Sequence, residues 1–332
     1  MREMLVDSYG RVVSYLRVSV TDRCNLRCVY CLPASHRPPF LSNDNLTDLE
    51  LARLAALFAE LGVSKIRVTG GEPLLRPGVP DLVRRLAGIG GIDDLSLSTN
   101  GLLLGGMAQD LAQAGLKRVN ISLDSLNPDK FRQVTRYGDL EAVLAGIDAA
   151  LAAGLSPVKL NVVVARGMNE EEIGDFVRLT EDRPLHVRLI ELMPMGETGF
   201  FSQERWMPLP EMMEKASPLQ ELPRDAWPLG HGPARYYRRP GALGTVGFVS
   251  ALSRGFCSSC NRLRLTAGGL LVPCLDAAEG TDLRAPLRRG ADAGEIRRLV
   301  LETVQRKPER HTLLERASSL SPNPRLMCQI GG

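Results

Sequence analysis

Residues 18–33 read Val-Ser-Val-Thr-Asp-Arg-Cys-Asn-Leu-Arg-Cys-Val-Tyr-Cys-Leu-Pro, which places Cys24, Cys28 and Cys31 in C-x3-C-x2-C spacing. Three thiolates this close together in sequence can grip one soft metal centre. A four-iron cluster normally takes four cysteine ligands, so three would leave one iron open to a group that is not protein. The segment therefore predicts a metal site with room for chemistry.

The spacing of these cysteines also permits two simpler interpretations. They could form most of a zinc site, for which His36 is the nearest fourth ligand. They could instead be unrelated buried cysteines, which pack as small hydrophobic residues. Spacing alone leaves all three interpretations open.

The composition is that of an ordinary globular protein. The chain has 332 residues, 44% of them hydrophobic and 24% charged, and a net charge of +3. This mild charge does not indicate a general nucleic-acid-binding protein, and no apolar run is long enough to span a membrane. Six of the seven cysteines fall into two groups of three, which favours metal binding in a reducing cytoplasm over disulfides. We expect the remaining one, Cys328, to be structural or incidental.

Strand-like runs alternate with helical patterns over the first part of the chain. We expect strands near 15–20, 65–69, 95–99, 119–124, 158–164 and 187–191, and helices near 48–61, 80–87, 107–114, 128–135, 140–153 and 170–180. Thr47 and Glu50 match a capping box, and Gly62, Gly115 and Gly154 stand where helix C-caps belong. The alternation predicts an α/β fold with parallel strands, a partial (βα)6 TIM-like barrel two units short of the closed form.

Several of these strands are apolar on one face only. Parallel strands are usually apolar on both faces, but here Arg17, Arg67 and Lys159 alternate with aliphatic residues. Helices must cover the aliphatic face, so the polar face should line the barrel interior. Buried basic side chains need anionic partners, which predicts a cavity for a polar anion. The alternative is a set of edge strands with solvated charges.

The chain changes character after about residue 195. Residues 195–240 are irregular and rich in proline, and we expect a connection with little regular structure. Short β-like runs and helical patterns near 283–289 and 293–306 follow. We therefore divide the chain into a barrel, residues 1–230, and a C-terminal α+β extension, residues 231–332.

The extension contains a second group of cysteines, Cys257, Cys260 and Cys274. A zinc knuckle completed by a distant residue is one interpretation. However, Arg262 and Arg264 follow Cys260 closely, and guanidinium groups form bidentate hydrogen bonds with phosphate oxygens. The pattern favours an anionic substrate beside a second open cluster.

The Cys24 segment, with Tyr30 directly before its third cysteine, resembles the radical S-adenosylmethionine (SAM) superfamily. The run Gly70-Gly71-Glu72-Pro73 resembles the Gly-Gly-Glu-Pro motif that receives the SAM amino group, although two glycines after a strand alone are more commonly a plain turn. The resemblance implies a [4Fe-4S] cluster on the first three cysteines, whose open iron binds SAM, and reductive cleavage to a 5′-deoxyadenosyl radical. It also implies SAM contacts from Tyr30, Gly71, Ser122 and Met193.

Nearly the whole chain resembles the GTP 3′,8-cyclase family, which opens molybdenum cofactor biosynthesis. The resemblance rests on the runs 65–73, 98–101, 120–124 and 257–264, together with Cys274 and the Gly-Gly terminus. It implies a lyase in which the radical takes hydrogen from C3′ of the GTP ribose and the substrate radical attacks C8, giving 3′,8-cyclo-7,8-dihydro-GTP. A second [4Fe-4S] cluster on Cys257, Cys260 and Cys274 would hold the guanine base.

The same resemblance implies a set of substrate residues and partners. The expected GTP contacts are Arg17, Arg67, Thr99, Lys159, Arg262, Leu263 and Arg264, and the Gly331–Gly332 tail is expected to reach the active site. The expected partners are an electron donor, a second copy of the chain, and a cyclic pyranopterin monophosphate synthase that receives the product. No nucleic-acid or membrane partner is expected.

Two other functional classes compete with this interpretation. Peptide-modifying radical SAM enzymes also carry auxiliary clusters, but they often have richer C-terminal cysteine sets than the single group seen here. An iron–sulfur scaffold or a zinc-bound structural protein would leave the Gly-Gly-Glu-Pro run and the polar strand faces unexplained.

Overall fold

The computed structural model of the protein describes residues 4–33, 35, 45–196, 198–230, 232–318 and 325–331. His36, the residue considered as a zinc ligand, lies outside the described residues.

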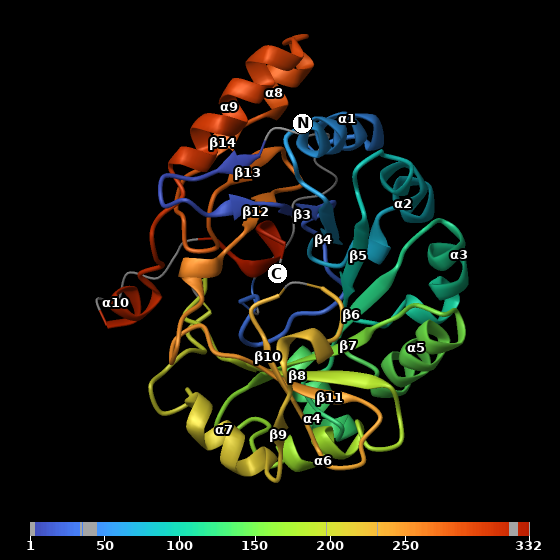
Figure 1. Ribbon diagram of the computed structural model, residues 1–332. Helices are drawn as coiled ribbons and strands as arrows, with labels where there is room; N and C mark the ends of the chain where they lie inside the picture. Colours follow the sequence, from blue (N-terminus) through green and yellow to red (C-terminus); the bar gives the residue numbers. More distant parts are fainter. Residues whose placement is uncertain are drawn as a thin grey trace.

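Six parallel strands follow one another in chain order and form the centre of the sheet. They are β3 (Tyr15–Ser19), β4 (Lys65–Thr69), β5 (Asp94–Thr99), β6 (Arg118–Ser122), β7 (Val158–Val164) and β8 (Leu185–Glu191). Helices α1 (Asp48–Glu60), α2 (Val79–Ala87), α3 (Ala108–Gln113), α4 (Pro128–Thr135), α5 (Leu140–Ala152) and α6 (Ile173–Arg178) surround this curved sheet on its outer side (Figure 1). The expected partial (βα)6 barrel is confirmed.

The C-terminal region adds a parallel strand to each edge of this barrel. Strand β11 (Thr245–Val249) pairs with β8, and β12 (Arg262–Leu265) pairs with β3. The two added strands are not hydrogen-bonded to each other, so eight parallel strands lie in a row without closing. The α+β extension is therefore built into the sheet of the barrel on both sides.

Short antiparallel strands continue the sheet beyond β11 and β12. On one side lie β10 (Arg235–Arg238) and β9 (Gln220–Glu221), and on the other β13 (Leu270–Val272) and β14 (Thr281–Asp282). The remaining elements are β1 (Leu5–Val6), β2 (Val12–Val13), α7 (Leu209–Ala216), α8 (Arg284–Arg288), α9 (Ala293–Gln305) and α10 (Leu313–Ser318), with 3-10 turns η1 (Pro73–Leu75), η2 (Leu104–Gly106), η3 (Arg224–Ala226), η4 (Cys257–Ser259) and η5 (Met327–Gln329).

The expectation of little regular structure over 195–240 is wrong. This region contains α7, β9 and β10. Helix α7 buries Leu209 and Met212, and the ring of Tyr237 on β10 packs edge-on against Phe248 with 5.4 Å between centroids. The prolines suggested irregular structure, but the proline in α7 lies in the first turn of the helix. A missing backbone N–H costs little stability there, so the helix forms despite the proline.

Local signals explain where the outer helices begin and end. The Thr47 hydroxyl accepts from the backbone N–H of Glu50, whose carboxylate accepts from the N–H of Thr47, so the expected capping box is confirmed. Gly62, Gly115 and Gly154 have positive φ directly after the C-caps of α1, α3 and α5, as expected.

The two faces of the strands divide as their alternation predicts. Leu16, Ile66 and Leu160 are fully buried in the main hydrophobic cluster between sheet and helices. The opposite face, carrying Arg17 and Arg67, lines the barrel interior. Because the helices bury the aliphatic face of the strands, the polar face is left to line the site. No helix in the described ranges is long and apolar enough to cross a membrane.

Candidate active site

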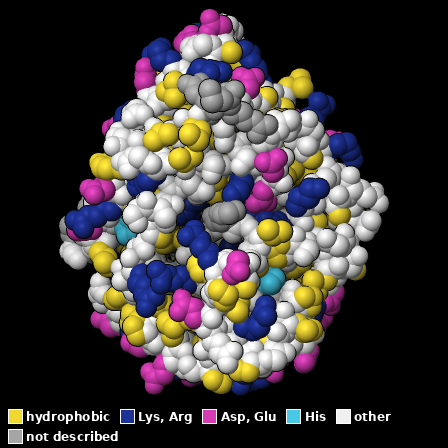
Figure 2. Space-filling view, in the orientation of Figure 1, with side chains coloured by type: hydrophobic (Ala, Val, Ile, Leu, Met, Phe, Trp, Pro, Cys, Tyr) yellow, Lys and Arg dark blue, Asp and Glu magenta, His cyan; other side chains and the backbone are white. Residues whose placement is uncertain are grey.

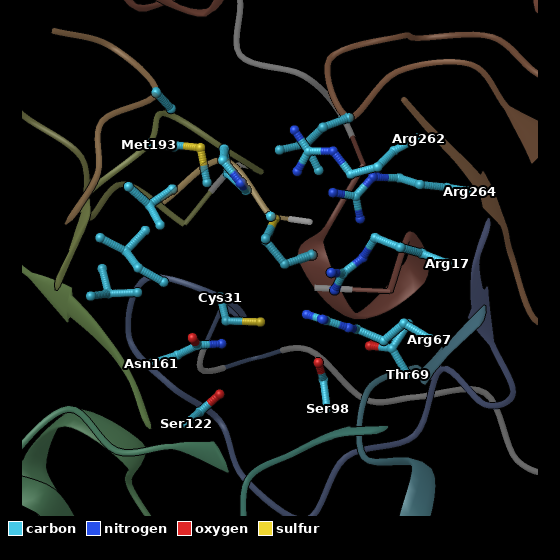
Figure 3. A pocket seen from close by; sticks show the side chains of 18 of the residues that line it. Arg17, Cys31, Arg67, Thr69, Ser98, Ser122, Asn161, Met193, Arg262 and Arg264 are labelled. Carbon is cyan, nitrogen blue, oxygen red and sulfur yellow. The ribbon is translucent and has the colours of Figure 1, made fainter. Parts of the chain in front are cut away.

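One cavity inside the barrel contains both groups of cysteines. Its lining includes all six of them, Cys24, Cys28, Cys31, Cys257, Cys260 and Cys274. Figure 2 shows a hollow near the centre of one face with basic side chains around it. In Figure 3, Arg17, Arg262 and Arg264 extend into the cavity from one side, while Cys31 and Met193 lie across from them. The two sequence motifs, more than 220 residues apart, therefore belong to one site.

The loop of the first cysteine group is held by helix α4. The backbone N–H groups of Arg27 and Val29 donate to the carbonyls of Thr135 and Val134, at 3.0 and 2.9 Å. Arg136 ends the helix and donates from Nη1 to the carbonyls of Arg27 and Leu32. Because Cys28 and Cys31 lie between these anchors, the end of α4 fixes where their thiols point.

The Gly-Gly-Glu-Pro run packs directly against the same loop. A Cβ on Gly70 or Gly71 would collide with the backbone of residues 21–23. The backbone N–H of Gly71 donates to the Thr21 carbonyl at 2.8 Å, and that of Glu72 donates to the Arg23 carbonyl at 2.7 Å. These glycines thus permit close approach by the chain's own cysteine loop, a reason that the sequence reasoning missed.

Glu72 itself is fully buried and turned toward the protein. Its carboxylate accepts from the Thr99 hydroxyl at 2.8 Å and from the backbone N–H groups of Leu74 and Asn100. Burial raises the pKa of Glu72 to about 7, and these donors oppose the shift. The carboxylate therefore ties the loops after β4 and β5 together.

The thiols of the first group fit a cationic iron centre. Burial raises the pKa of Cys24, Cys28 and Cys31, so that a thiolate is favoured here only when a positive centre binds it. Within the described part of the chain, no three Cys, His, Asp or Glu side chains gather closely enough to hold a single metal ion. A four-iron cluster binds each cysteine at a different iron, so its ligands need not converge on one point.

Residues expected to contact SAM surround this loop. Tyr30, Gly71, Ser122 and Met193 all line the cavity. The Tyr30 hydroxyl donates to Asp124 at 2.6 Å, and the other oxygen of Asp124 accepts from the backbone N–H of Val163 at 2.8 Å. Burial raises the pKa of Asp124 to about 6. Asp124 therefore orients Tyr30, which the sequence reasoning did not anticipate.

The second cysteine group is assembled by a buried lysine. Lys307 donates from Nζ to the carbonyls of Arg262 and Pro273, at 2.9 and 2.8 Å, and so joins the segments that carry Cys260 and Cys274. Burial alone would raise the pKa of Cys260, but the charges of Arg262 and Lys307, together with hydrogen bonds from Arg262, outweigh it and lower that pKa to about 7. This group therefore also suits a metal centre that binds thiolates.

Buried guanidinium groups line the cavity with these cysteines. Arg67 donates from Nε to the Ser96 hydroxyl, and Arg188 donates from Nη2 to the Asn120 side chain. Burial lowers the pKa of Arg67 well below its usual range, and that of Arg264 to about 10. In the described parts of the chain, no carboxylate forms an ion pair with Arg67, Arg188 or Arg264. Such a set attracts a polyanion.

The C-terminal tail lies inside the barrel, as expected for Gly331. The Gly331 carbonyl accepts from Nε and Nη2 of Arg17, at 3.1 and 2.8 Å, and from Nη1 of Arg264 at 3.1 Å. Figure 1 shows the red C-terminal segment inside the curve of the open sheet. Gly332 lies outside the described residues.

Three expected substrate residues are placed differently from the rest. Lys159 does not line the cavity: its Nζ donates to the carbonyls of Pro228 and Leu229, at 3.4 and 2.5 Å. The side chain of Leu263 is buried in the hydrophobic cluster outside the sheet, so only its backbone can face a ligand. Thr99 lines the cavity, but its hydroxyl already donates to Glu72.

Arg188 and Lys307 are site residues that the sequence reasoning missed. Arg188 alternates with Val187 and Leu189 on β8, so the pattern used for the other strands could have found it. Lys307 follows α9 and carries no comparable signal, because it reaches the site only through the tertiary fold.

Comparison with known protein families matches both parts of the chain. Residues 18–180 match the model of the radical SAM superfamily, and residues 185–313 match the Molybdenum Cofactor Synthesis C model. Among solved structures, Streptococcus suis SuiB, also solved with bound S-adenosylmethionine, superposes with a TM-score of 0.56. The identity is 13%, over 81% of this chain and 62% of SuiB. This likeness concerns the fold alone.

Curated relatives match over nearly their entire length. The GTP 3′,8-cyclase of Heliobacterium modesticaldum is 50% identical over 99% of this chain and 100% of its own. Those of Pelotomaculum thermopropionicum and Moorella thermoacetica are 50% and 48% identical, each over 98% of this chain and 99% of their own. The chain belongs to the radical SAM superfamily and, within it, to the GTP 3′,8-cyclase family.

Proposed function

We propose that this chain converts GTP to 3′,8-cyclo-7,8-dihydro-GTP, the first step of molybdenum cofactor biosynthesis. The observation that carries the proposal is the single cavity that both three-cysteine sites share with buried guanidinium groups. A radical source alone would need one cysteine group, and an anion site alone would need none. Near-complete alignment with curated GTP 3′,8-cyclases supports the same activity.

The cofactors are two [4Fe-4S] clusters and SAM, of which the first cluster and SAM would supply a 5′-deoxyadenosyl radical for hydrogen abstraction at the ribose C3′. Cys24, Cys28 and Cys31 would hold the radical-generating cluster, and Cys257, Cys260 and Cys274 the second one. Tyr30, Gly71, Ser122 and Met193 would contact SAM. The protein itself mainly binds, orients and shields the reactants.

The basic side chains position the triphosphate. Burial makes uncompensated guanidinium groups costly, so Arg67 and Arg264 gain most from a phosphate partner. Arg17 and Arg262 would add further donors, and Thr99 and the Leu263 backbone would border the nucleotide. Lys159 would join only if the segment at 228–229 releases it, since both of those carbonyls now accept from its Nζ.

Further assignments follow from family membership and are proposals. Residues 1–230 would act as the radical-generating barrel and residues 231–332 as the unit for the second cluster and the substrate. The enzyme would work in the cytoplasm as a homodimer with an electron donor, and would hand its product to a cyclic pyranopterin monophosphate synthase. Gly331 and Gly332 would close the active site.

An anaerobic assay tests the activity. The iron-reconstituted protein is incubated with SAM, dithionite and GTP, and 5′-deoxyadenosine and the cyclised nucleotide are measured by mass spectrometry. Both should form together and only with GTP. If 5′-deoxyadenosine forms without a nucleotide product, the cyclase assignment fails and another substrate is required.

Two variants separate the two halves of the site. Cys24→Ala should abolish 5′-deoxyadenosine formation, because the first cluster loses a ligand. The double variant Arg262→Ala and Arg264→Ala should keep both clusters, measured as iron per chain, but bind GTP more weakly. An unchanged GTP affinity would show that the nucleotide binds at another site.

A further inference from the structure

A seventh cysteine lies beside the first cysteine group. We expected Cys328 to be structural or incidental, but it lines the same cavity as Cys24, Cys28 and Cys31. It is carried on η5, in the described tail segment 325–331, and only 3% of its surface is exposed. The fold therefore gathers four thiols in one place, from two parts of the chain nearly 300 residues apart.

Cys328 is in direct contact with this group. Its backbone N–H donates a hydrogen bond to the sulfur of Cys31, and its thiol is close enough for electrostatic interaction with both Cys31 and Cys24. The segment that brings the thiol here is thus bonded to a residue expected to bind the cluster. A randomly placed buried cysteine would not need either contact.

The tail is docked directly after Cys328. After it, Ile330 is 1% exposed and packs with Met195, Leu252 and Leu313. Next to it, the Gly331 carbonyl is held by Arg17 and Arg264. The position of the thiol is therefore set by the fold rather than by a frayed chain end.

The chemistry of the site provides a role for a fourth thiol. Three cysteines satisfy three irons of a four-iron cluster, and thiolate is the ligand that these irons ordinarily take. SAM fills the fourth position only when it is bound. Between turnovers, the open iron would otherwise face solvent or small oxidants in the cavity.

We propose that Cys328 is a fourth, exchangeable ligand of the radical-generating cluster, bound to the open iron while SAM is absent. This inference rests on the proposed function in that it takes the first cysteine group to hold that cluster. When SAM arrives, its ammonium group loses one proton, its amino nitrogen and carboxylate oxygen donate to the iron, the iron–sulfur bond to Cys328 breaks, and the departing thiolate takes up that proton. No oxidation state changes, so the exchange needs no oxidant or reductant.

Spectroscopy of the reconstituted full-length protein tests this ligand directly. The cluster is examined by ⁵⁷Fe Mössbauer and, after dithionite reduction, by EPR spectroscopy, with and without SAM. Wild type without SAM should show four thiolate-ligated irons at the first cluster, and SAM should convert one of them to nitrogen and oxygen ligation. Cys328→Ala should show one iron with a non-thiolate ligand even without SAM.

SAM affinity gives an independent readout. If the thiol caps about nine-tenths of the clusters, its removal should lower the apparent Kd for SAM about tenfold, because the competing state is lost. Cys328→Ser keeps the size of the side chain and should behave like Cys328→Ala if the sulfur matters. Gln329→Ala removes an exposed side chain whose Oε1 accepts from the backbone N–H of Leu326 on the same turn, so it serves as the control for loosened tail docking without loss of the thiol.

Three outcomes would overturn the proposal. Identical SAM-free spectra in Cys328→Ala and wild type would show a structural thiol only. An unchanged Kd for SAM in both cysteine variants would exclude competition. An equal effect of Gln329→Ala would assign the change to tail docking rather than to sulfur. None of these readouts involves GTP, so a failure of the cyclase assay would count against the proposed function alone.

Discussion

Gly331→Ala is the change that the tail should tolerate least. Gly331 has a φ of +72°, and an added Cβ would lie 2.6 Å from Cγ2 of Thr69. The same residue presents the carbonyl that Arg17 and Arg264 bind. Alanine therefore opposes the docked tail in two ways, by its backbone conformation and by its volume.

The two costs can be estimated separately. A left-handed conformation costs an L-residue about 1–2 kcal/mol, and forcing one methyl group into a packed site costs about 1–3 kcal/mol. Together they disfavour the docked tail by about 2–5 kcal/mol, or roughly 30-fold to several thousandfold. Each hydrogen bond from an arginine contributes only about 1.5–3 kcal/mol, so a substantial part of the docking energy would be lost.

Hydrogen exchange and product analysis measure the effect. Backbone amides of residues 325–331 should exchange faster in Gly331→Ala, because the tail leaves the barrel. Water then reaches the cavity, so 5′-deoxyadenosine should exceed the cyclised nucleotide, whereas wild type should form the two in equal amounts. Thr69→Ser in the same chain removes the colliding methyl and should restore part of the protection.

Gly167→Ala is the matched control for backbone conformation. Its φ is +71°, but nothing lies within 4 Å of the added Cβ, and the residue is not among those that line the cavity. It should leave both tail exchange and product ratio unchanged. Wild-type exchange and an unchanged product ratio in Gly331→Ala would refute the idea that a docked tail shields the cavity.

Three further predictions concern charged residues. Arg264→Met should raise the Kd for GTP about 10- to 150-fold, the loss of a charge-assisted hydrogen bond of about 1.5–3 kcal/mol, with both clusters intact; an unchanged Kd in equilibrium binding would contradict this. Burial lowers the pKa of Lys159 to about 5, so above pH 5 the folded state binds fewer protons than the unfolded state. The free energy of unfolding should then rise with pH, by up to about 1.4 kcal/mol per unit between pH 6 and 8, and Lys159→Met should lose this slope in denaturant titrations; equal slopes would show that Lys159 stays charged. Asp94→Ala leaves the buried Arg118 without its 2.7 Å ion pair and should lower the free energy of unfolding by about 3–5 kcal/mol. The control Asp81→Ala, in an exposed pair, should lower it by less than about 1 kcal/mol. Similar melting temperatures for the two variants would contradict this difference.

The sequence alone determined the barrel and the chemistry-bearing residues of both cysteine groups. The alternation of Arg17 and Arg67 with aliphatic residues placed them in the interior, because helices must cover the aliphatic face. Capping signals likewise marked the start of α1. These features depend on residues that are close together in the sequence, so the periodicity of the sequence predicts them directly.

Only the tertiary structure decided how distant segments complete the site. It placed β11 and β12 on opposite edges of the barrel, and it covered Lys159 with the carbonyls of residues 228 and 229. It also carried Cys328 from the end of the chain to Cys31. Each of these contacts joins segments far apart in the chain, and its geometry follows from packing rather than from any local pattern. Residues such as Lys307, which holds two cysteine segments together through their carbonyls, therefore left no signal in the sequence.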